Sequence, residues 1–184
     1  MHNKEKYDEK ALLKRLKNPL TQRSAFSELV QQYSEQLYWH IRHMVLSHED
    51  TNDLLQNTFI KAWTGMDNFR GESLLSTWLY RIAINETLTF LNKRPKTIPI
   101  DSPEGSIVEQ LESDTYFNGD RAEMEFQKAL QSLPPKQRLV FNMKYYDEMK
   151  YEEMSELLGT SIGALKASYH IATKKIEEIL KNKD

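Results

Sequence analysis

The stretch that decides the fold is residues 151–180, which read YEEMSELLGTSIGALKASYHIATKKIEEIL. Its first part has the composition of a short helix, and Gly159 then supplies the left-handed residue that commonly follows a tightly ended helix. Ser161 can cap a second helix after a short turn. On that second helix the apolar residues alternate spacings of four and three, which places them on one buried face: Leu165, Tyr169, Ala172, Ile176 and Ile179. The stretch therefore predicts a helix-turn-helix.

The opposite side of this second helix is predicted to be exposed and suited to DNA. It carries two cations, a histidine and small side chains that allow close approach to a major groove. These residues are Gly163, Lys166, Ala167, His170, Ile171 and Lys174. An ordinary helical hairpin shows the same pattern, and it remains the alternative at this point.

Three more helical patterns fill residues 22–94, upstream of this motif. Apolar residues recur at spacings of three and four, Ser47 is the predicted cap of the second helix, and Pro95 is the predicted stop of the third. Residues 95–120 contain three prolines and two glycines and lack a consistent apolar face. The fold class we expect is all-α, with an N-terminal helical bundle (1–94), a flexible acidic linker (95–120) and a C-terminal helix-turn-helix domain (121–184).

The formal net charge of −2 is unevenly distributed. Residues 95–133 hold three basic and eight acidic side chains, whereas the blocks on either side are weakly basic. Charge therefore permits DNA binding without demanding it. The absence of cysteine excludes disulfides and thiolate chemistry, and no signal-peptide-like apolar run opens the sequence, so we expect a cytoplasmic protein.

The third helical pattern and the break before it mix aromatic rings with cations. Single-stranded nucleic acid is bound in this way, because bases stack on rings while cations neutralise phosphates. The residues are Phe69, Arg70, Trp78, Tyr80, Arg81, Asn85, Lys93 and Arg94. Trp78 also fits the apolar stripe, so burial in the core is its alternative role.

Three motifs together resemble the extracytoplasmic-function (ECF) sigma factors of the sigma-70 family. Residues 50–63, DTNDLLQNTFIKAW, are similar to the motif with which that family binds core RNA polymerase. Residues 69–73, FRGES, and 76–85, STWLYRIAIN, are similar to its promoter-melting segment. Residues 133–141, LPPKQRLVF, with 151–170, are similar to its C-terminal helix-turn-helix. The motifs stand in the family's order and cover nearly the whole chain from residue 22.

The resemblance implies a role for each matching position. Contacts to the clamp coiled coil of the polymerase's largest subunit are expected from Asp50, Asp53, Leu54, Gln56, Asn57, Phe59, Ile60 and Trp63. Contacts to melted minus-ten DNA are expected from Asn68, Phe69, Arg70, Ser73, Trp78, Arg81, Asn85, Lys93 and Arg94. Contacts to minus-thirty-five duplex are expected from Arg138, Ser161, Gly163, Ala164, Lys166, Ala167, His170, Ile171 and Lys174.

The resemblance also implies partners and a non-catalytic function. The expected function is that of an alternative sigma factor, an initiation subunit that needs no cofactor or catalytic residue. Its partners would be core polymerase (clamp and flap), promoter DNA and an anti-sigma factor. One departure stands out, since Ser168, Ile171 and Thr173 occupy positions at which the family often carries Arg. Fewer cations predict an atypical minus-thirty-five sequence and modest affinity for isolated DNA.

Two other functions are alternatives to this one. A metalloenzyme could use His40, His43, His48 and Glu35, but no third ligand has convincing spacing, and no metal site is expected. A DNA-binding regulator that does not engage polymerase would explain the helix-turn-helix. It would leave residues 53–63 and the aromatic and basic third helix without a role.

Overall fold

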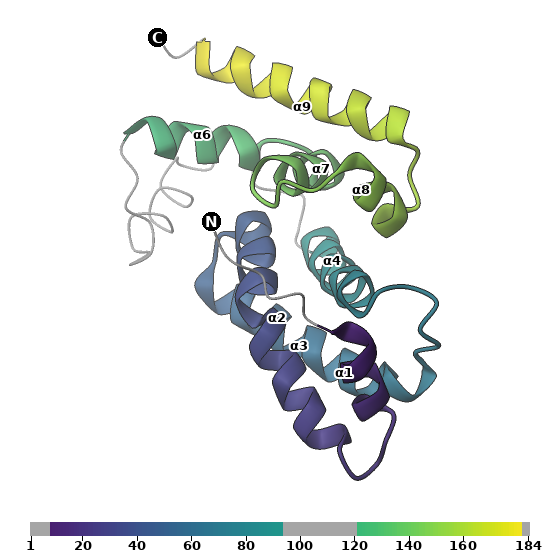
Figure 1. The fold of residues 1–184 in the computed structure, drawn as a ribbon. Helices are drawn as coiled ribbons and strands as arrows, with labels where there is room; N and C mark the ends of the chain where they lie inside the picture. Colours follow the sequence, from purple (N-terminus) through teal and green to yellow (C-terminus); the bar gives the residue numbers. More distant parts are fainter. Residues whose placement is uncertain (1–7, 94–120, 182–184) are drawn as a thin grey trace.

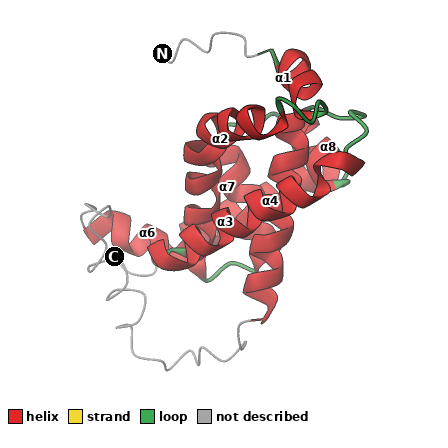
Figure 2. Ribbon diagram, turned by 90° about the horizontal axis from the view of Figure 1, so that it is seen from below, coloured by secondary structure: helices red, strands yellow, loops and turns green. Residues whose placement is uncertain are grey.

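The computed structural model describes residues 8–93 and 121–181, and within them the fold is all-α, as predicted (Figures 1 and 2). The linker assigned to 95–120 lies outside the described residues. The N-terminal half contains α1 (Glu9–Leu16), α2 (Gln22–Val45), α3 (His48–Gly65), the short 3-10 helix η1 (Met66–Asn68) and α4 (Leu75–Lys93). The C-terminal half contains α6 (Arg121–Gln131), α7 (Pro135–Tyr145), α8 (Tyr151–Leu158) and α9 (Ile162–Lys181).

The N-terminal half closes around the apolar stripes of α2, α3 and α4. Leu29, Leu37, Ala62, Leu79 and Ala83 are all fully buried in one core. Ser47 caps α3 as predicted, because its hydroxyl oxygen accepts a hydrogen bond from the Asp50 backbone N–H at 3.2 Å.

Helix α1 was not predicted, and it belongs to this same core. Its Leu12 and Leu16 are 2% and 0% exposed. Asp8 caps it by accepting hydrogen bonds from the backbone of Lys10 and Ala11, both at 3.1 Å. Eight residues are too few for a helix to be stable alone, so tertiary packing decides that it forms.

The helix-turn-helix of the C-terminal half forms as the sequence predicts. Gly159 ends α8 in the left-handed conformation (φ 62°), and its N–H donates to the Ser155 carbonyl. Ser161 caps α9 by accepting from the Ala164 N–H at 3.3 Å. The predicted inner stripe of α9 is buried at Leu165, Ala172 and Ile176 and partly buried at Tyr169 and Ile179.

The two halves pack directly on each other, with α7 and α8 lying between α9 and helices α2 and α4 (Figure 1). Leu139, Val140 and Met143 of α7 join the buried cluster of the N-terminal half. A second cluster, which includes Leu130, Phe141 and Ile176, holds α6, α7 and α9 together. The C-terminal half therefore shares part of its core with the N-terminal half.

Candidate nucleic-acid interface

A pocket of about 840 Å³ opens beside α3, α4 and the loop that joins them. It gathers seven of the nine residues predicted to contact minus-ten DNA: Asn68, Phe69, Arg70, Ser73, Trp78, Arg81 and Asn85. Lys93, at the exposed end of α4, is not among its lining residues, and Arg94 lies outside the described residues. Sequence motifs separated by several residues thus form one continuous site.

The pocket combines stacked aromatic rings with cations. The rings of Phe69 and Trp78 lie 4.8 Å apart at an interplanar angle of 30°. Phe69 is only 7% exposed, so its ring lies mainly in the core and packs against the Trp78 ring from that side. Arg70 and Arg81 are exposed at the pocket. An aromatic surface flanked by guanidinium groups can stack a nucleobase and neutralise its phosphate.

Gly65 allows Trp78 to lie close to the end of α3. A Cβ atom at this position would lie 3.3 Å from the Trp78 ring, closer than ordinary van der Waals contact. Any side chain at position 65 would therefore press on the indole.

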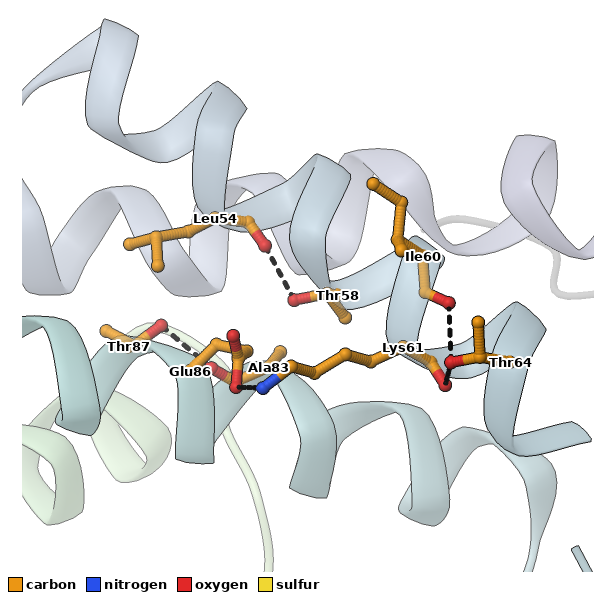
Figure 3. Close-up of polar contacts among 8 residues, drawn as sticks. All are labelled: Leu54, Thr58, Ile60, Lys61, Thr64, Ala83, Glu86 and Thr87. Carbon is orange, nitrogen blue, oxygen red and sulfur yellow. Dashed lines mark hydrogen bonds and ion pairs between the residues drawn. The ribbon is translucent and has the colours of Figure 1, made fainter. Parts of the chain in front are cut away.

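The wall between α3 and α4 is held by a charge pair that was not predicted. Lys61 of α3 donates to Glu86 of α4, and both line the pocket (Figure 3). Figure 3 also shows Thr58 and Thr87 directing their hydroxyl groups back to the carbonyls of Leu54 and Ala83. The facing sides of the two helices thereby satisfy their own polar groups, and α3 and α4 can pack closely.

Tyr80 does not join the pocket. It lies partly buried, edge-on against His40, with the ring centroids 5.3 Å apart. Burial raises the pKa of its hydroxyl above the ordinary value, and nearby Asp147 adds to this shift.

The residues predicted to bind polymerase lie on α3, mostly at its surface. Asp53, Gln56, Asn57, Ile60 and Trp63 are exposed, and Ile60 and Trp63 are 53% and 42% exposed. Asp50 and Phe59 are partly buried. Leu54 is 5% exposed and packs into the core, as the helical spacing of the apolar residues indicates, so little of its side chain lies at this surface. The surface is therefore polar with two large apolar side chains.

The predicted duplex-reading side of α9 is exposed along its whole length: Ser161, Gly163, Ala164, Lys166, Ala167, His170, Ile171 and Lys174. Arg138 is different, because it lies on α7 with 5% exposure and donates to the side chain of Gln131. Its guanidinium is engaged inside the C-terminal half, so Arg138 is not available to a phosphate here. The family resemblance implied a phosphate contact for Arg138, but in the structure its side chain joins α7 to the end of α6.

The contact between the two halves also includes polar groups, and His40 and Asn142 among them are buried. His40 Nδ1 lies 2.6 Å from Asp147 Oδ2, and Asn142 Nδ2 donates to the His43 carbonyl at 3.0 Å. Arg81 Nη2 donates to the Glu156 carbonyl of α8 at 3.1 Å. Because Glu156 also lines the pocket, the C-terminal half borders the candidate nucleic-acid site.

The histidines considered as metal ligands face different partners. His40 pairs with Asp147, while His48 lies 2.7 Å from the Tyr38 hydroxyl and 3.0 Å from the Asn52 amide. Within residues 8–93 and 121–181 no group of three or more His, Asp or Glu is placed to hold a metal ion. No helix in the same described ranges is long and apolar enough to cross a membrane.

Sequence motifs missed the pocket residues Lys61, Glu86 and Glu156 and the pair His40–Asp147. Lys61 lies inside a recognised motif, but its direction toward α4 carries no sequence signal. Glu156 and Asp147 lie in the C-terminal half, far along the chain from the residues that they meet. Only the packing of α7 and α8 on the N-terminal half brings them together.

Two sequence-family models match the chain: "Sigma-70 region 2" over residues 29–97 and "Sigma-70, region 4" over residues 123–176. The chain is 30% identical to the ECF RNA polymerase sigma factor SigG of Mycobacterium tuberculosis over 181 residues, which covers 85% of this chain and 49% of SigG. It therefore spans about half the length of that relative. It is 29% identical to SigW of Bacillus subtilis, an ECF sigma factor, with 86% of this chain and 90% of SigW covered.

A solved structure shares the fold. It is that of the sigma factor RpoE of Bartonella quintana in complex with the anti-sigma factor NepR, with a TM-score of 0.62 and 25% identity. The similarity covers 85% of this chain and 96% of that one. With the two family matches in the expected order, the chain belongs to the extracytoplasmic-function group of the sigma-70 family.

Proposed function

We propose that this chain is an alternative sigma factor, which binds core RNA polymerase and directs initiation at particular promoters without a catalytic site of its own. The observation that carries the proposal is the pocket beside α3 and α4. It brings Asn68, Arg70, Trp78, Arg81 and Asn85 together beside a separate helix-turn-helix. A pocket for unstacked bases and a helix for duplex DNA are the two readers that promoter recognition requires.

The pocket would hold a base from the melted minus-ten strand. Trp78 offers a ring face for stacking, and Arg70 and Arg81 offer charge to the backbone. Asn85 and Ser73 can donate and accept hydrogen bonds at base edges. This chemistry favours single-stranded over duplex DNA, because a paired base cannot enter a pocket.

The exposed side of α9 would read the minus-thirty-five duplex. Lys166 and Lys174 provide charge, while Gly163 and Ala167 let the helix backbone approach the groove. Ser161, at the N-terminus of α9, lies where free backbone N–H groups favour a phosphate. With few cations on this surface, affinity for isolated DNA is expected to be modest.

Core polymerase would bind the exposed surface of α3 through Asp53, Gln56, Asn57, Ile60 and Trp63.

Polymerase would also set the distance between the pocket that binds minus-ten DNA and the helix α9 that binds minus-thirty-five DNA. The two promoter elements lie about 25 base pairs apart, or about 85 Å along the helix axis. In the structure the two halves are in contact through the shared apolar cluster, which includes Leu139 and Met143, and through polar contacts such as Arg81 to Glu156. Promoter reading therefore requires α7 and α8 to separate from α2 and α4.

An anti-sigma factor is the proposed regulatory partner. The support is the likeness to RpoE, whose structure was solved with the anti-sigma factor NepR.

The decisive experiment is reconstituted transcription with the purified chain, sigma-free bacterial core polymerase and a genomic promoter library. We expect discrete start sites that share two upstream motifs. Absence of start sites, together with failure to bind core polymerase in a pull-down, would contradict the proposal. That result would leave a DNA-binding regulator that does not engage polymerase.

A further inference from the structure

The loop between η1 and α4, residues 69–74, supplies Phe69, Arg70 and Ser73 to the pocket. It ends at the start of α4, where the first backbone N–H groups have no partner within the helix. Leu74 precedes α4, and its apolar side chain cannot accept a hydrogen bond. The loop thus joins α4 at a helix start that is not capped by the side chain of the preceding residue, Leu74.

Glu9 of α1, distant in sequence, supplies the missing cap. Its carboxylate accepts hydrogen bonds from the Leu75 N–H at 2.9 Å and the Ser76 N–H at 3.4 Å. The Tyr33 hydroxyl donates to the same carboxylate at 2.8 Å and orients it. A negative charge at a helix N-terminus also interacts favourably with the helix dipole.

Two further contacts join the N-terminal segment to the same region. Leu13 Cδ2 lies 3.3 Å from the position that a Cβ atom would take on Gly71, so α1 lies directly against the loop. Gln22, at the start of α2, donates to Asp67 of η1 at 3.2 Å. Leu12 and Leu16 anchor α1 in the core, which fixes Glu9 relative to α2. The loop is therefore held at both of its ends by residues 9–22.

We propose that Glu9 is a positioning residue for minus-ten recognition, acting by fixing the loop that carries Arg70 and Ser73. This inference rests on the proposed function of the pocket. It extends that function to α1, which lies outside the region 2 match over residues 29–97. Glu9 touches no DNA in this proposal. It sets the place at which the loop enters α4, and hence the distance between Arg70 and Trp78.

The test compares Glu9→Ala with Lys10→Ala, an exposed neighbour on the same helix turn. The probe is a fluorescent single strand carrying the minus-ten sequence found from the mapped start sites, bound to holoenzyme. Loss of a helix cap typically corresponds to about a fivefold change in an equilibrium. We expect Glu9→Ala to weaken binding of the strand about fivefold, with Lys10→Ala unchanged. Affinity for core polymerase and for minus-thirty-five duplex should stay the same in both variants.

A rescue separates capping from general damage. In the Glu9→Ala background, Leu74→Asp places a capping carboxylate at the residue before α4. Leu74 is 63% exposed and does not line the pocket, so the change costs little packing. Recovery of single-strand binding in the double variant supports the inference. If Glu9→Ala unfolds, Glu9→Gln is compared with Glu9→Gln/Leu74→Asp in the same way.

The outcomes distinguish this inference from the function on which it rests. If the wild-type holoenzyme binds no single-stranded minus-ten DNA, the proposed function of the pocket fails. If wild type binds and Glu9→Ala binds equally well, only the role of Glu9 is overturned. Equal loss of single-strand, duplex and core binding would also overturn it, because that pattern indicates general destabilisation.

Discussion

His43 shows how a single residue couples the contact between the two halves to pH. Its imidazole stacks on Tyr146 of the C-terminal half, with ring centroids 3.8 Å apart and planes inclined by 12°. Burial lowers the pKa of His43 to about 4; nearby Asp147 opposes this shift, while His40 and Arg42 add to it. The ring is therefore neutral at pH 7 and suited to stacking in a partly buried site.

Acidification should destabilise the protein through this residue. The unfolded chain protonates His43 near its ordinary pKa of 6.5, whereas the folded chain does so only near 4. This contribution to stability is thus nearly complete above pH 6.5 and is lost as the pH falls toward 4. Between pH 7 and 5 the free energy of unfolding should fall by about 2 kcal/mol. Urea unfolding at both values measures it. In His43→Gln, most of the difference in unfolding free energy between pH 7 and pH 5 should disappear. An unchanged pH dependence in this variant would show that His43 is not its cause.

Lys166 is the residue on which the duplex-reading side of α9 can be tested most directly. Its ammonium group lies 5.7 Å from the centre of the Tyr151 ring, and the side chain is exposed. Removing one phosphate contact should reduce the slope of log affinity against log salt by about 0.9. Holoenzyme binding to promoter duplex, titrated over salt for Lys166→Ala, checks this. Lys181→Ala, at the far end of α9, should leave the slope unchanged.

At the scale of elements, the turn between α8 and α9 depends on the backbone of Gly159. This residue has a φ of 62°, and a Cβ added there would meet nothing within 4 Å. Only the left-handed conformation, and not crowding, therefore favours glycine at this position. Gly163, inside α9, also has open space but no positive φ, so it provides a matched comparison.

Gly159→Ala should lower the free energy of unfolding by about 1 kcal/mol, because alanine is strained in the left-handed region. Gly163→Ala should have the opposite sign and raise it by about 0.4–1 kcal/mol, because alanine fits the first turn of α9 without strain and restricts the unfolded chain. Thermal and urea unfolding of both variants give the comparison. A destabilised Gly163→Ala, or an unaffected Gly159→Ala, would show that crowding or local rearrangement dominates instead.

At the scale of the whole molecule, the contact between the halves is suited to separation. It includes polar atoms that are buried without a hydrogen-bond partner in the described part of the chain: His40 Nε2, His43 Nδ1 and Asn142 Oδ1. Each such atom costs free energy that a purely apolar core avoids. The proposed function requires the two halves to move apart. Separating a contact that contains unpaired buried polar atoms costs less free energy than separating a wholly apolar one.

Asp147→Asn should favour the separated state by about 1–3 kcal/mol, because it weakens a short, largely buried hydrogen bond to His40. The chain contains no cysteine, so Gln36→Cys and Glu177→Cys give unique dye positions on exposed residues of α2 and α9. Single-molecule energy transfer should decrease relative to the parent. Glu148→Gln removes the same charge from an exposed neighbour and should change nothing. Equal effects of the two variants would indicate a general charge effect.

The helices and their caps could be predicted from sequence because their signals are local. Spacings of three and four defined the buried faces of α2, α3, α4 and α9. Ser47 and Ser161 marked the starts of α3 and α9, and Gly159 marked the end of α8. Seven of the pocket residues were found as motifs, since they all lie within residues 68–85 of the chain. Local periodicity and capping chemistry act over a few residues, and the sequence displays them directly.

Tertiary structure decided the relations between distant segments. It placed Glu9 at the start of α4, Glu156 at the rim of the pocket and Asp147 against His40. It also buried Arg138, whose role implied by the family resemblance was a contact to phosphate. A carboxylate near a helix start or a cation on a helix has many possible partners in the sequence. Which one it meets depends on how whole faces pack, and that choice depends on the summed burial of many side chains rather than on any local signal.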